Sequence, residues 1–166
     1  MKRFFTLLAA MFVLTTTFTS CWSEDDEIRS TLRGTWQGNM HIYMTFNGYD
    51  GDYYASNSTI TFNSDGTGYQ VDHFGYNAPR SYVFSEFRWS VTAGVIHLKY
   101  IEDNYYVNIY DYNLTDNYFD GRFEDGTTFR LNYLSSYDWN YYRNGYSKAT
   151  RASSDNLPAF TRHMGK

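Results

Sequence analysis

Residues 36–46, WQGNMHIYMTF, alternate strictly between two kinds of side chain. Trp36, Gly38, Met40, Ile42, Met44 and Phe46 fall on one side of an extended backbone. Gln37, Asn39, His41, Tyr43 and Thr45 fall on the other side. A period of two is typical of a β-strand with one buried face and one face toward water. The stretch therefore predicts one long strand over Trp36–Phe46.

The rest of the chain repeats this pattern in shorter units. It contains 18 Tyr, 13 Phe and 4 Trp but only 2 Pro, and aromatic residues favour strands. Turn sequences recur roughly every 8–12 residues, as NGYDGD, NSDGTG, TAGV, IEDNY, LTDNY and EDGT. We therefore expect an all-β fold, an up-and-down antiparallel meander of about eight strands closing into a barrel. A two-sheet sandwich stays open as an alternative.

The later strands can be placed by their apolar residues. They lie near Ser58–Phe62, Gly68–Phe74, Ser81–Val91, Ile96–Tyr100, residues 105–114, Phe119–Phe123 and Phe129–Tyr133. In Ser81–Val91, Phe87, Trp89 and Val91 share one face. Tyr82 and Phe84 are out of phase with them, which predicts a β-bulge near Ser85. Residues 105–114 are apolar on both faces, so the pattern does not phase them.

The N-terminus has the build of a secretory signal. Lys2 and Arg3 precede a short apolar run in MKRFFTLLAAMFVL, and small polar residues follow. The run is shorter than the roughly 20 residues that a spanning helix needs. A buried N-terminal helix is the structural alternative.

The end of this segment resembles a bacterial lipoprotein signal. Phe18, Thr19 and Ser20 directly precede Cys21, the chain's single cysteine. The family has leucine where Phe18 stands, whereas Ser20 fits. The resemblance implies acylation of Cys21, which tethers the chain to a membrane. The following WSEDDE resembles the signal for surface export in Gram-negative bacteria, so we expect an outer-membrane lipoprotein exposed at the surface, or otherwise a periplasmic protein. Ordinary cleavage that leaves a free thiol is the alternative.

The charge pattern agrees with a folded domain behind a tether. Residues 21–166 keep 12 of the 14 cations and all 18 acids, a net charge of −6, and Glu24, Asp25, Asp26 and Glu27 lie just after Cys21. The sequence has no basic stripe of the kind that binds nucleic acid, so we expect no nucleic-acid partner. We predict a signal over 1–20, a disordered acidic tether over 21–30, a barrel over 31–134 and a C-terminal extension over 135–166. Trp139, Tyr141 and Tyr142 would cover the barrel or add an edge strand, and the chain after Ser147 would be loose.

A second resemblance concerns the barrel. RGTWQG, with Gly34, Thr35 and Trp36, resembles the opening of the lipocalins, and LTDNY loosely resembles a later lipocalin motif. TITFNSDGTGY and FDGRFEDGTTF are similar to segments of short bacterial lipocalin-like lipoproteins. The resemblance covers about residues 31–134. It implies that Trp36 plugs the barrel base under a stacked arginine, for which Arg130 and Arg143 are candidates. It also implies that the protein binds a ligand, and it points to no particular reaction.

An eight-stranded barrel has room for side chains or for one small ligand. We therefore predict that a small apolar or amphipathic molecule contacts Met40, Met44, Trp89, Tyr100 and Tyr110 in the lumen. The competing interpretation is that these residues are ordinary core. A different hypothesis takes the Tyr-rich segments NGYDGDYY and DNYYVNIYDYN as exposed platforms for a glycan or a partner protein.

Enzymatic functions have little support in the sequence. His41, His73, His97 and His163 lack the short spacings of zinc ligands, and nucleophile-elbow or phosphate-loop motifs are missing. Asp50 and Asp52 are more typical of a turn than of a glycosidase pair, and NGYDGD lacks the closing acid of a calcium loop. We expect no catalysis, no metal site and no cofactor.

Overall fold

The computed structural model describes residues 23–144 and 157–165. One helix, α2 (Glu24–Leu32), precedes the strands, and a further helical turn covers residues 139–144. The strands are β1 (Gly34–Asn39), β2 (Ile42–Phe46), β3 (Tyr53–Phe62), β4 (Thr67–Phe74), β5 (Tyr82–Thr92), β6 (Val95–Tyr100), β7 (Tyr106–Leu114), β8 (Tyr118–Phe123), β9 (Thr128–Leu134) and β10 (Phe160–Met164). No helix among these residues is long and apolar enough to cross a bilayer.

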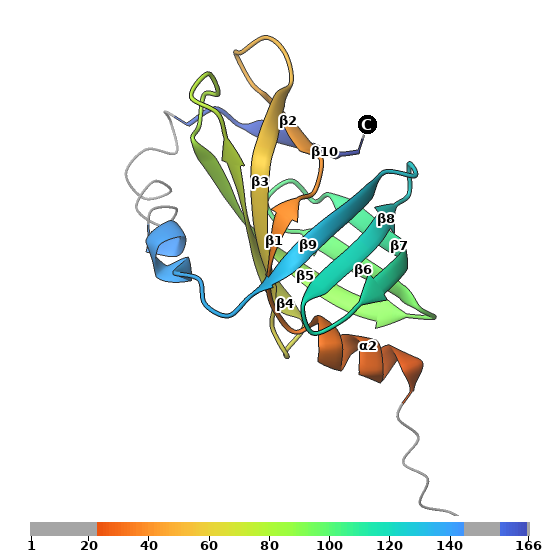
Figure 1. Ribbon diagram of the computed structural model, residues 1–166. Coiled ribbons are helices and arrows are strands. Elements are labelled where there is room, and N and C mark those ends of the chain that lie inside the picture. Colours follow the sequence, from red (N-terminus) through yellow and green to blue (C-terminus); the bar gives the residue numbers. More distant parts are fainter. Residues whose placement is uncertain (1–22, 145–156, 166) are drawn as a thin grey trace, which may run out of the picture.

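The strands close into a barrel. Neighbours follow one another from β3 to β9, and β1 pairs with both β9 and β3, so eight antiparallel strands form a ring. Trp36 lies opposite Ile60 on one side and Tyr133 on the other. The predicted all-β barrel is confirmed, and closure through β1 excludes the sandwich. Strands β2 and β10 extend the sheet beyond the ring, next to β3 (Figure 1).

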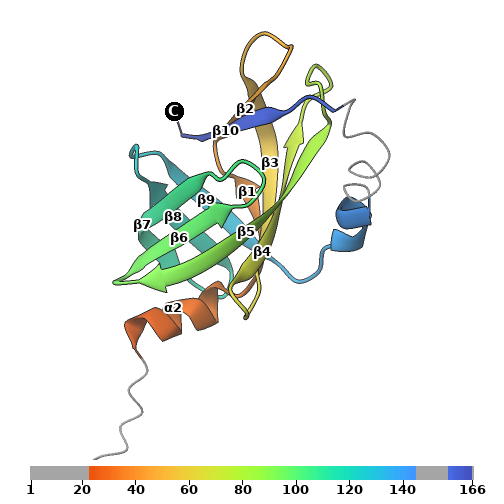
Figure 2. The same ribbon diagram turned by 180° about the vertical axis from the view of Figure 1, so that it is seen from behind.

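The prediction of one continuous strand over Trp36–Phe46 is wrong, because the segment forms two strands, β1 and β2. The backbone breaks between β1 and β2, where His41 has a φ of 51° and its amide donates to Asn39 Oδ1 at 2.8 Å. The alternation of buried residues nevertheless runs through the break, because Met40, Ile42 and Met44 are all fully buried. The break lets β1 complete the ring while β2 turns away with β10 (Figure 2).

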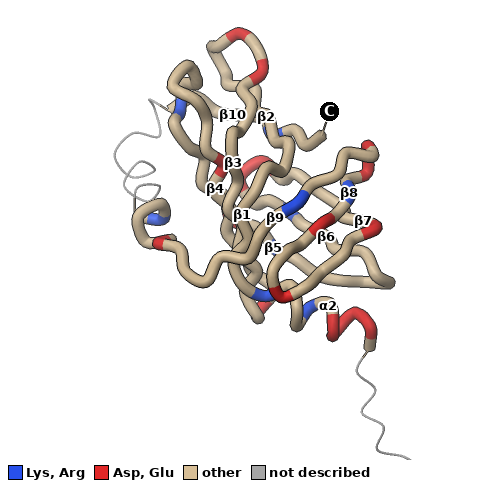
Figure 3. The backbone as a smooth tube through the Cα atoms, in the orientation of Figure 1, with Lys and Arg blue, Asp and Glu red and all other residues tan. Residues whose placement is uncertain are grey.

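The acidic segment is a helix and not a disordered tether. Ser23 caps α2, with its hydroxyl accepting from the Asp26 amide, and the four acids occupy the first turn, where the helix dipole favours them (Figure 3). Asp25 also accepts from the Ala93 and Gly94 amides at 3.1 and 2.9 Å. Leu32 is fully buried. Asp25 and Leu32 therefore fix α2 against one end of the barrel, which we call the closed end.

The bulge predicted near Ser85 is absent. Strands β4 and β5 pair without a register shift from Thr67 opposite Arg88 to His73 opposite Tyr82. Tyr82 and Phe84 are out of phase because they face outward, where the C-terminal extension covers them. The Phe84 ring lies 6.4 Å from Trp139, and the Tyr82 ring lies 5.1 Å from Tyr142. This bears out the expected contact of the extension with the barrel flank.

The register shifts that do occur lie in β3, between Ala55 and Asn57, and in β7, between Tyr110 and Asn113. In β7, Asp111 adopts a φ of 45° at the shift. Val107 and Ile109 are buried before it. The shift explains why residues 105–114 could not be assigned to a single alternating pattern.

The prediction that the chain after Ser147 is loose is wrong for its last part. Residues 160–164 form β10, with Arg162 opposite Met44 of β2. Arg162 is buried, with 1 % of its surface exposed. An edge strand is thus present, formed by a later segment than the Tyr-rich one.

Trp36 plugs the closed end, as the resemblance implies. It is 1 % exposed, and its indole Nε1 donates to the Leu32 carbonyl at 2.8 Å. The rings of Tyr133 and Phe119 pack edge-on against it, at 5.3 and 6.0 Å. The two candidate arginines lie elsewhere, since Arg130 pairs with Asp120 and Arg143 lies over Tyr69. The predicted arginine stack is thus wrong for both.

Candidate functional site

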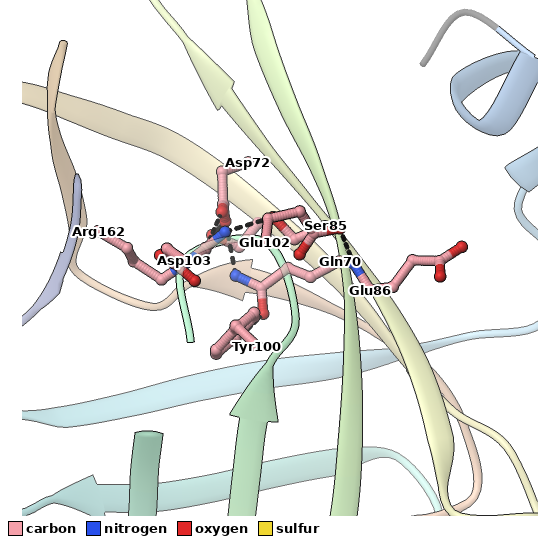
Figure 4. A network of polar contacts seen from close by, with 9 residues as sticks. Gln70, Asp72, Ser85, Glu86, Tyr100, Glu102, Asp103 and Arg162 are labelled. Carbon is pink, nitrogen blue, oxygen red and sulfur yellow. Dashed lines mark hydrogen bonds and ion pairs between the residues drawn. The ribbon is translucent and has the colours of Figure 1, made fainter. Parts of the chain in front are cut away.

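We call the barrel end opposite α2 the mouth. A buried arginine, Arg162, fills it. Strand β10 projects Arg162 inward, where its Nη1 donates to Asp72 Oδ2 at 2.6 Å and its Nη2 donates to Ser85 Oγ (Figure 4). The guanidinium lies 4.2 Å from the Tyr100 ring centre. Both side chains of the Arg162–Asp72 ion pair are fully buried. A buried pair of this kind needs hydrogen bonds on its remaining atoms to offset desolvation.

Neighbouring strands supply such bonds to Asp72, whereas Arg162 Nε is buried without a hydrogen-bond partner among the described residues. Ser58 Oγ and Gln70 Nε2 each donate to Asp72 Oδ1 at 2.7 Å. The Tyr100 hydroxyl donates to Gln70 Oε1 at 2.5 Å. Burial raises the pKa of Tyr100, so this hydroxyl keeps its proton. The network, which also includes Ser85 of β5, therefore locks β3, β4, β5, β6 and β10 together at the mouth.

Two acids on the loop between β6 and β7, Glu102 and Asp103, lie beside the network but have few hydrogen bonds of their own. Glu102 Oε1 accepts from the Glu86 amide at 2.8 Å, while its Oε2 is buried without a hydrogen-bond partner among the described residues. Burial raises the pKa of Glu102. Asp103 Oδ2 lies 3.6 Å from Arg162 Nε, and neither Asp103 oxygen has a hydrogen bond within the described chain. The mouth thus carries buried carboxylates that are only partly compensated.

The lumen below the network is filled by aromatic side chains. The Phe62 ring contacts Trp89, Phe87 and Phe119 in edge-to-face geometry, at 5.3, 5.5 and 6.3 Å. Gly121 leaves room for this packing, because a Cβ there would come within 2.6 Å of the Phe129 ring. These aromatic residues are therefore core packing, and Trp89 also borders a pocket formed with residues of β5, β6 and β7.

A pocket of about 310 Å³ opens at the rim of the mouth. Its apolar wall is formed by Tyr105, Val107, Phe123 and Met164, and Glu124 and Asp125 of the β8–β9 turn provide an acidic edge. The turn is one of the red bends on the tube in Figure 3. We call this the rim pocket.

The residues predicted to bind a ligand are spread over the core and the surface. Met40 and Met44 are fully buried in the core. Trp89 is also core, and its Nε1 donates to the Asn63 and Thr67 carbonyls at 3.1 and 3.0 Å. Tyr100 belongs to the mouth network. Tyr110 is half-buried on the opposite side of β7 from Ile109, with the Arg122 guanidinium 6.0 Å from its ring. None of the five lines the rim pocket, whereas Trp89 borders a second pocket with residues of β5, β6 and β7. Their ligand-binding role stays a prediction.

Cys21 lies outside the described residues. Within residues 23–144 and 157–165, no group of three or more His, Cys, Asp or Glu side chains is placed to hold a metal ion. His163 stacks on Tyr43 at 4.6 Å, and His73 is 3.3 Å from the Tyr137 hydroxyl. The histidines are thus dispersed over the barrel.

Comparison with known sequences bears on the family. The sequence model of the lipocalin-like domain matches residues 32–121, more than half of the chain. The chain belongs to the lipocalin-like domain family. Comparison with curated proteins found no significant match. Among solved structures, a redesigned β-barrel is similar, with 18 % identity, a TM-score of 0.34, and coverage of 65 % of this chain and 95 % of that one.

Within this lipocalin-like domain, sequence reasoning missed the mouth network. Gln70 and Asp72 lie on the same inward face of β4 as Gly68 and Phe74. Two polar residues at core positions could have indicated a buried polar network. Arg162 gave no such signal, because its contacts are with residues 77 and 90 positions earlier in the chain. The match ends at residue 121, before β10.

Proposed function

We propose that this lipocalin-like domain is a non-catalytic binding protein that holds a small amphipathic ligand in the rim pocket. The observation that carries the proposal is the combination of a filled lumen with an open pocket at its edge. The pocket volume of about 310 Å³ lies at the lower end of the usual range for ligand sites, roughly 300–1,000 Å³. The ligand is therefore small.

The lining of the rim pocket indicates the chemistry of the ligand. Val107, Phe123 and Met164 offer an apolar wall, and Glu124 and Asp125 offer carboxylates at the edge. The Asp125 carboxylate already accepts from Thr127 through its amide and its hydroxyl. Glu124 is exposed. A molecule with an apolar body and a cationic or hydrogen-bond-donating end matches this arrangement.

We also propose that Cys21 is acylated and anchors the domain at the bacterial outer membrane. The support comes from the sequence and from the position of α2. This helix begins three residues after Cys21 and lies at the end of the barrel opposite the mouth (Figure 1). An anchor at Cys21 would therefore leave the rim pocket facing away from the bilayer.

The pocket can be tested with methionine methyl signals. Met164 lines the rim pocket, whereas Met44 is buried in the core. In the full chain labelled with ¹³C-methyl methionine, n-hexylamine should shift the Met164 signal saturably and leave that of Met44 unchanged. Hexanoate should act more weakly because of the acidic edge.

Matched variants test the role of charge. Glu124→Gln should weaken n-hexylamine binding about two- to fivefold, the range for exposed ionic contacts. Asp116→Asn removes one charge from an exposed turn at the closed end and should change nothing. Absence of any shift at Met164, or a shift centred on Met44, would contradict a ligand site at the rim.

A glycan platform is the alternative function, and one surface favours it. Tyr43 stacks on His163 at 4.6 Å and lies 5.4 Å from Tyr54, which is 54 % exposed. These rings form an aromatic strip on β2, β3 and β10, and such strips can stack on sugar faces. Tyr54→Ala should abolish binding to an oligosaccharide array if this strip is the site. Unchanged array binding would exclude it, and Met164 shifts would be unaffected in either case.

A further inference from the structure

A second pocket of about 310 Å³ is lined by residues of β5, β6 and β7. Figure 2 shows these three strands side by side. Trp89 and Leu98 of the core contribute to its lining, and six outward side chains from adjacent strands surround it in two rows. Arg88, Lys99 and Tyr106 form one row across the strands, and Ser90, His97 and Asn108 form the other. We call this surface the basic groove.

Arg88 and Lys99 are direct cross-strand partners with the same charge. Like charges in this position repel and destabilise a sheet. The chain treats other exposed cations differently, since Arg130 lies directly opposite Asp120 and bonds to it at 2.5 and 2.6 Å. Arg122 likewise pairs with Asp111. The basic groove therefore breaks a rule that the same barrel follows elsewhere.

Nearby acids do not neutralise the groove. Neither Arg88 nor Lys99 forms a salt bridge within the described residues, and the Lys99 ammonium lies 5.1 Å from the Tyr106 ring. Asp65 is close enough for Arg88 to help lower its pKa, but the larger cause is the bond that its carboxylate accepts from Thr67. The two cations thus remain open to an external anion.

Hydrogen-bonding groups with fixed orientation stand beside the cations. His97 Nδ1 is 2.8 Å from Asn108 Oδ1, which holds the His97 ring and turns its Nε2 away from that bond. The Asn108 amide nitrogen and the Ser90 hydroxyl are further donors in the same row. Two cations, neutral donors and one aromatic face match an oxyanion better than they match a neutral or cationic group.

We propose that the basic groove binds a phosphate-type oxyanion, either free or carried on a lipid head group. Arg88 and Lys99 supply the charge, and Ser90 and Asn108 supply neutral donors. Binding relieves the repulsion between the two cations. The site lies outside the barrel and does not depend on occupancy of the rim pocket, although Tyr106 and Asn108 border both.

The test compares the full chain with an Arg88→Gln/Lys99→Gln variant. Inorganic phosphate should raise the melting temperature of the wild type above that in chloride of equal ionic strength. The variant should lose this response, with binding weakened about two- to fivefold for each cation removed, the range for exposed ionic contacts. Without phosphate, its melting temperature should equal or exceed that of the wild type, because the repulsion is gone.

A second arm separates the two sources of the anion. Co-sedimentation with phosphatidylglycerol vesicles, relative to phosphatidylcholine vesicles, should fall in the variant if a lipid head group is bound. Both chains carry the same N-terminal segment, so its contribution cancels. Arg130→Gln removes a paired cation and serves as the matched control in both arms.

Each outcome decides the proposal. A phosphate response or a phosphatidylglycerol preference that is lost in Arg88→Gln/Lys99→Gln and kept in Arg130→Gln supports it. A wild type that responds to neither probe overturns it, and so does a variant that responds like the wild type.

Discussion

The two ends of the barrel are built from different chemistry. At the closed end, Trp36, Phe62 and Phe119 pack through aromatic edges, and the buried polar atom of Trp36 has a backbone partner. At the mouth, Arg162 and Asp72 form a buried ion pair surrounded by polar side chains. The closed end gains its stability from apolar burial, which tolerates changes of pH. The mouth depends on matched charges, so the loss of one group affects the rest.

The difference also concerns where the residues come from. The closed end is assembled from strands of the ring together with the adjoining helix α2. The mouth needs Arg162, which arrives on β10 from outside the ring. The stability of the mouth therefore depends on the docking of β10 and on the charge of its residues. Variants at the two ends should accordingly differ in how much stability they lose.

The largest effect is expected for Arg162→Met. This change leaves Asp72 as a buried charge without its cation, which destabilises proteins by about 3–5 kcal/mol. Urea unfolding followed by far-ultraviolet circular dichroism measures the loss. Arg122→Met removes an exposed paired cation and should change stability by less than about 1 kcal/mol. Equal effects of the two substitutions would mean that the mouth network contributes no more than a surface pair.

Gly121→Ala tests the packing of the lumen. A methyl group at this position meets Phe129 at 2.6 Å and Ile109 at 2.7 Å. Overpacking of this kind destabilises by about 1–3 kcal/mol. Gly75→Ala is the matched control, because a Cβ there has no atom within 4 Å. The same urea titration measures the stability of both variants. A Gly121→Ala variant as stable as the wild type would show that the lumen has free space.

The sequence predicted the closed end better than the mouth for a physical reason. The alternation from Trp36 to Phe46 is local, so it identified the buried residues even across the backbone break at His41. Tyr82 and Phe84 misled the phasing because Trp139 and Tyr142 bury the outer face of β5. The acids of α2 suggested solvent, yet Asp25 bonds to turn amides about 70 residues later. Such long-range contacts leave no periodic trace.

Asp25→Ala tests the helix contact at the closed end. The substitution removes the acceptor for the Ala93 and Gly94 amides, and Ala93 adopts a φ of 52° that alanine disfavours. We expect a loss of about 1 kcal/mol, the usual contribution of such hydrogen bonds. Glu24→Ala deletes the same charge from the first turn of α2 and should have a smaller effect. Comparable losses would assign the effect to helix charge and not to the turn.

The smallest effect is expected for Glu102→Gln, and it should depend on pH. Burial raises the pKa of Glu102, and this outweighs the opposing bond from the Glu86 amide and the attraction of Arg162. The folded chain therefore keeps this proton at pH values where the unfolded chain, with an ordinary pKa of 4.5, has lost it. The resulting stabilisation is complete below that value and disappears as the pH rises through the raised pKa.

Glutamine keeps the acceptor for the Glu86 amide and carries no charge, so it removes this pH dependence. Glu102→Gln should match the wild type at pH 3.5 and exceed its stability at pH 7.5 by about 0.5 kcal/mol, typical of a change that creates no cavity. Urea midpoints across this pH range measure the difference. Glu124→Gln makes the same chemical change on an exposed turn and is the matched control. A stability difference for Glu102→Gln that does not vary with pH would place Glu102 in contact with water. The dependence of the mouth on charge would then rest on Arg162 and its direct partners.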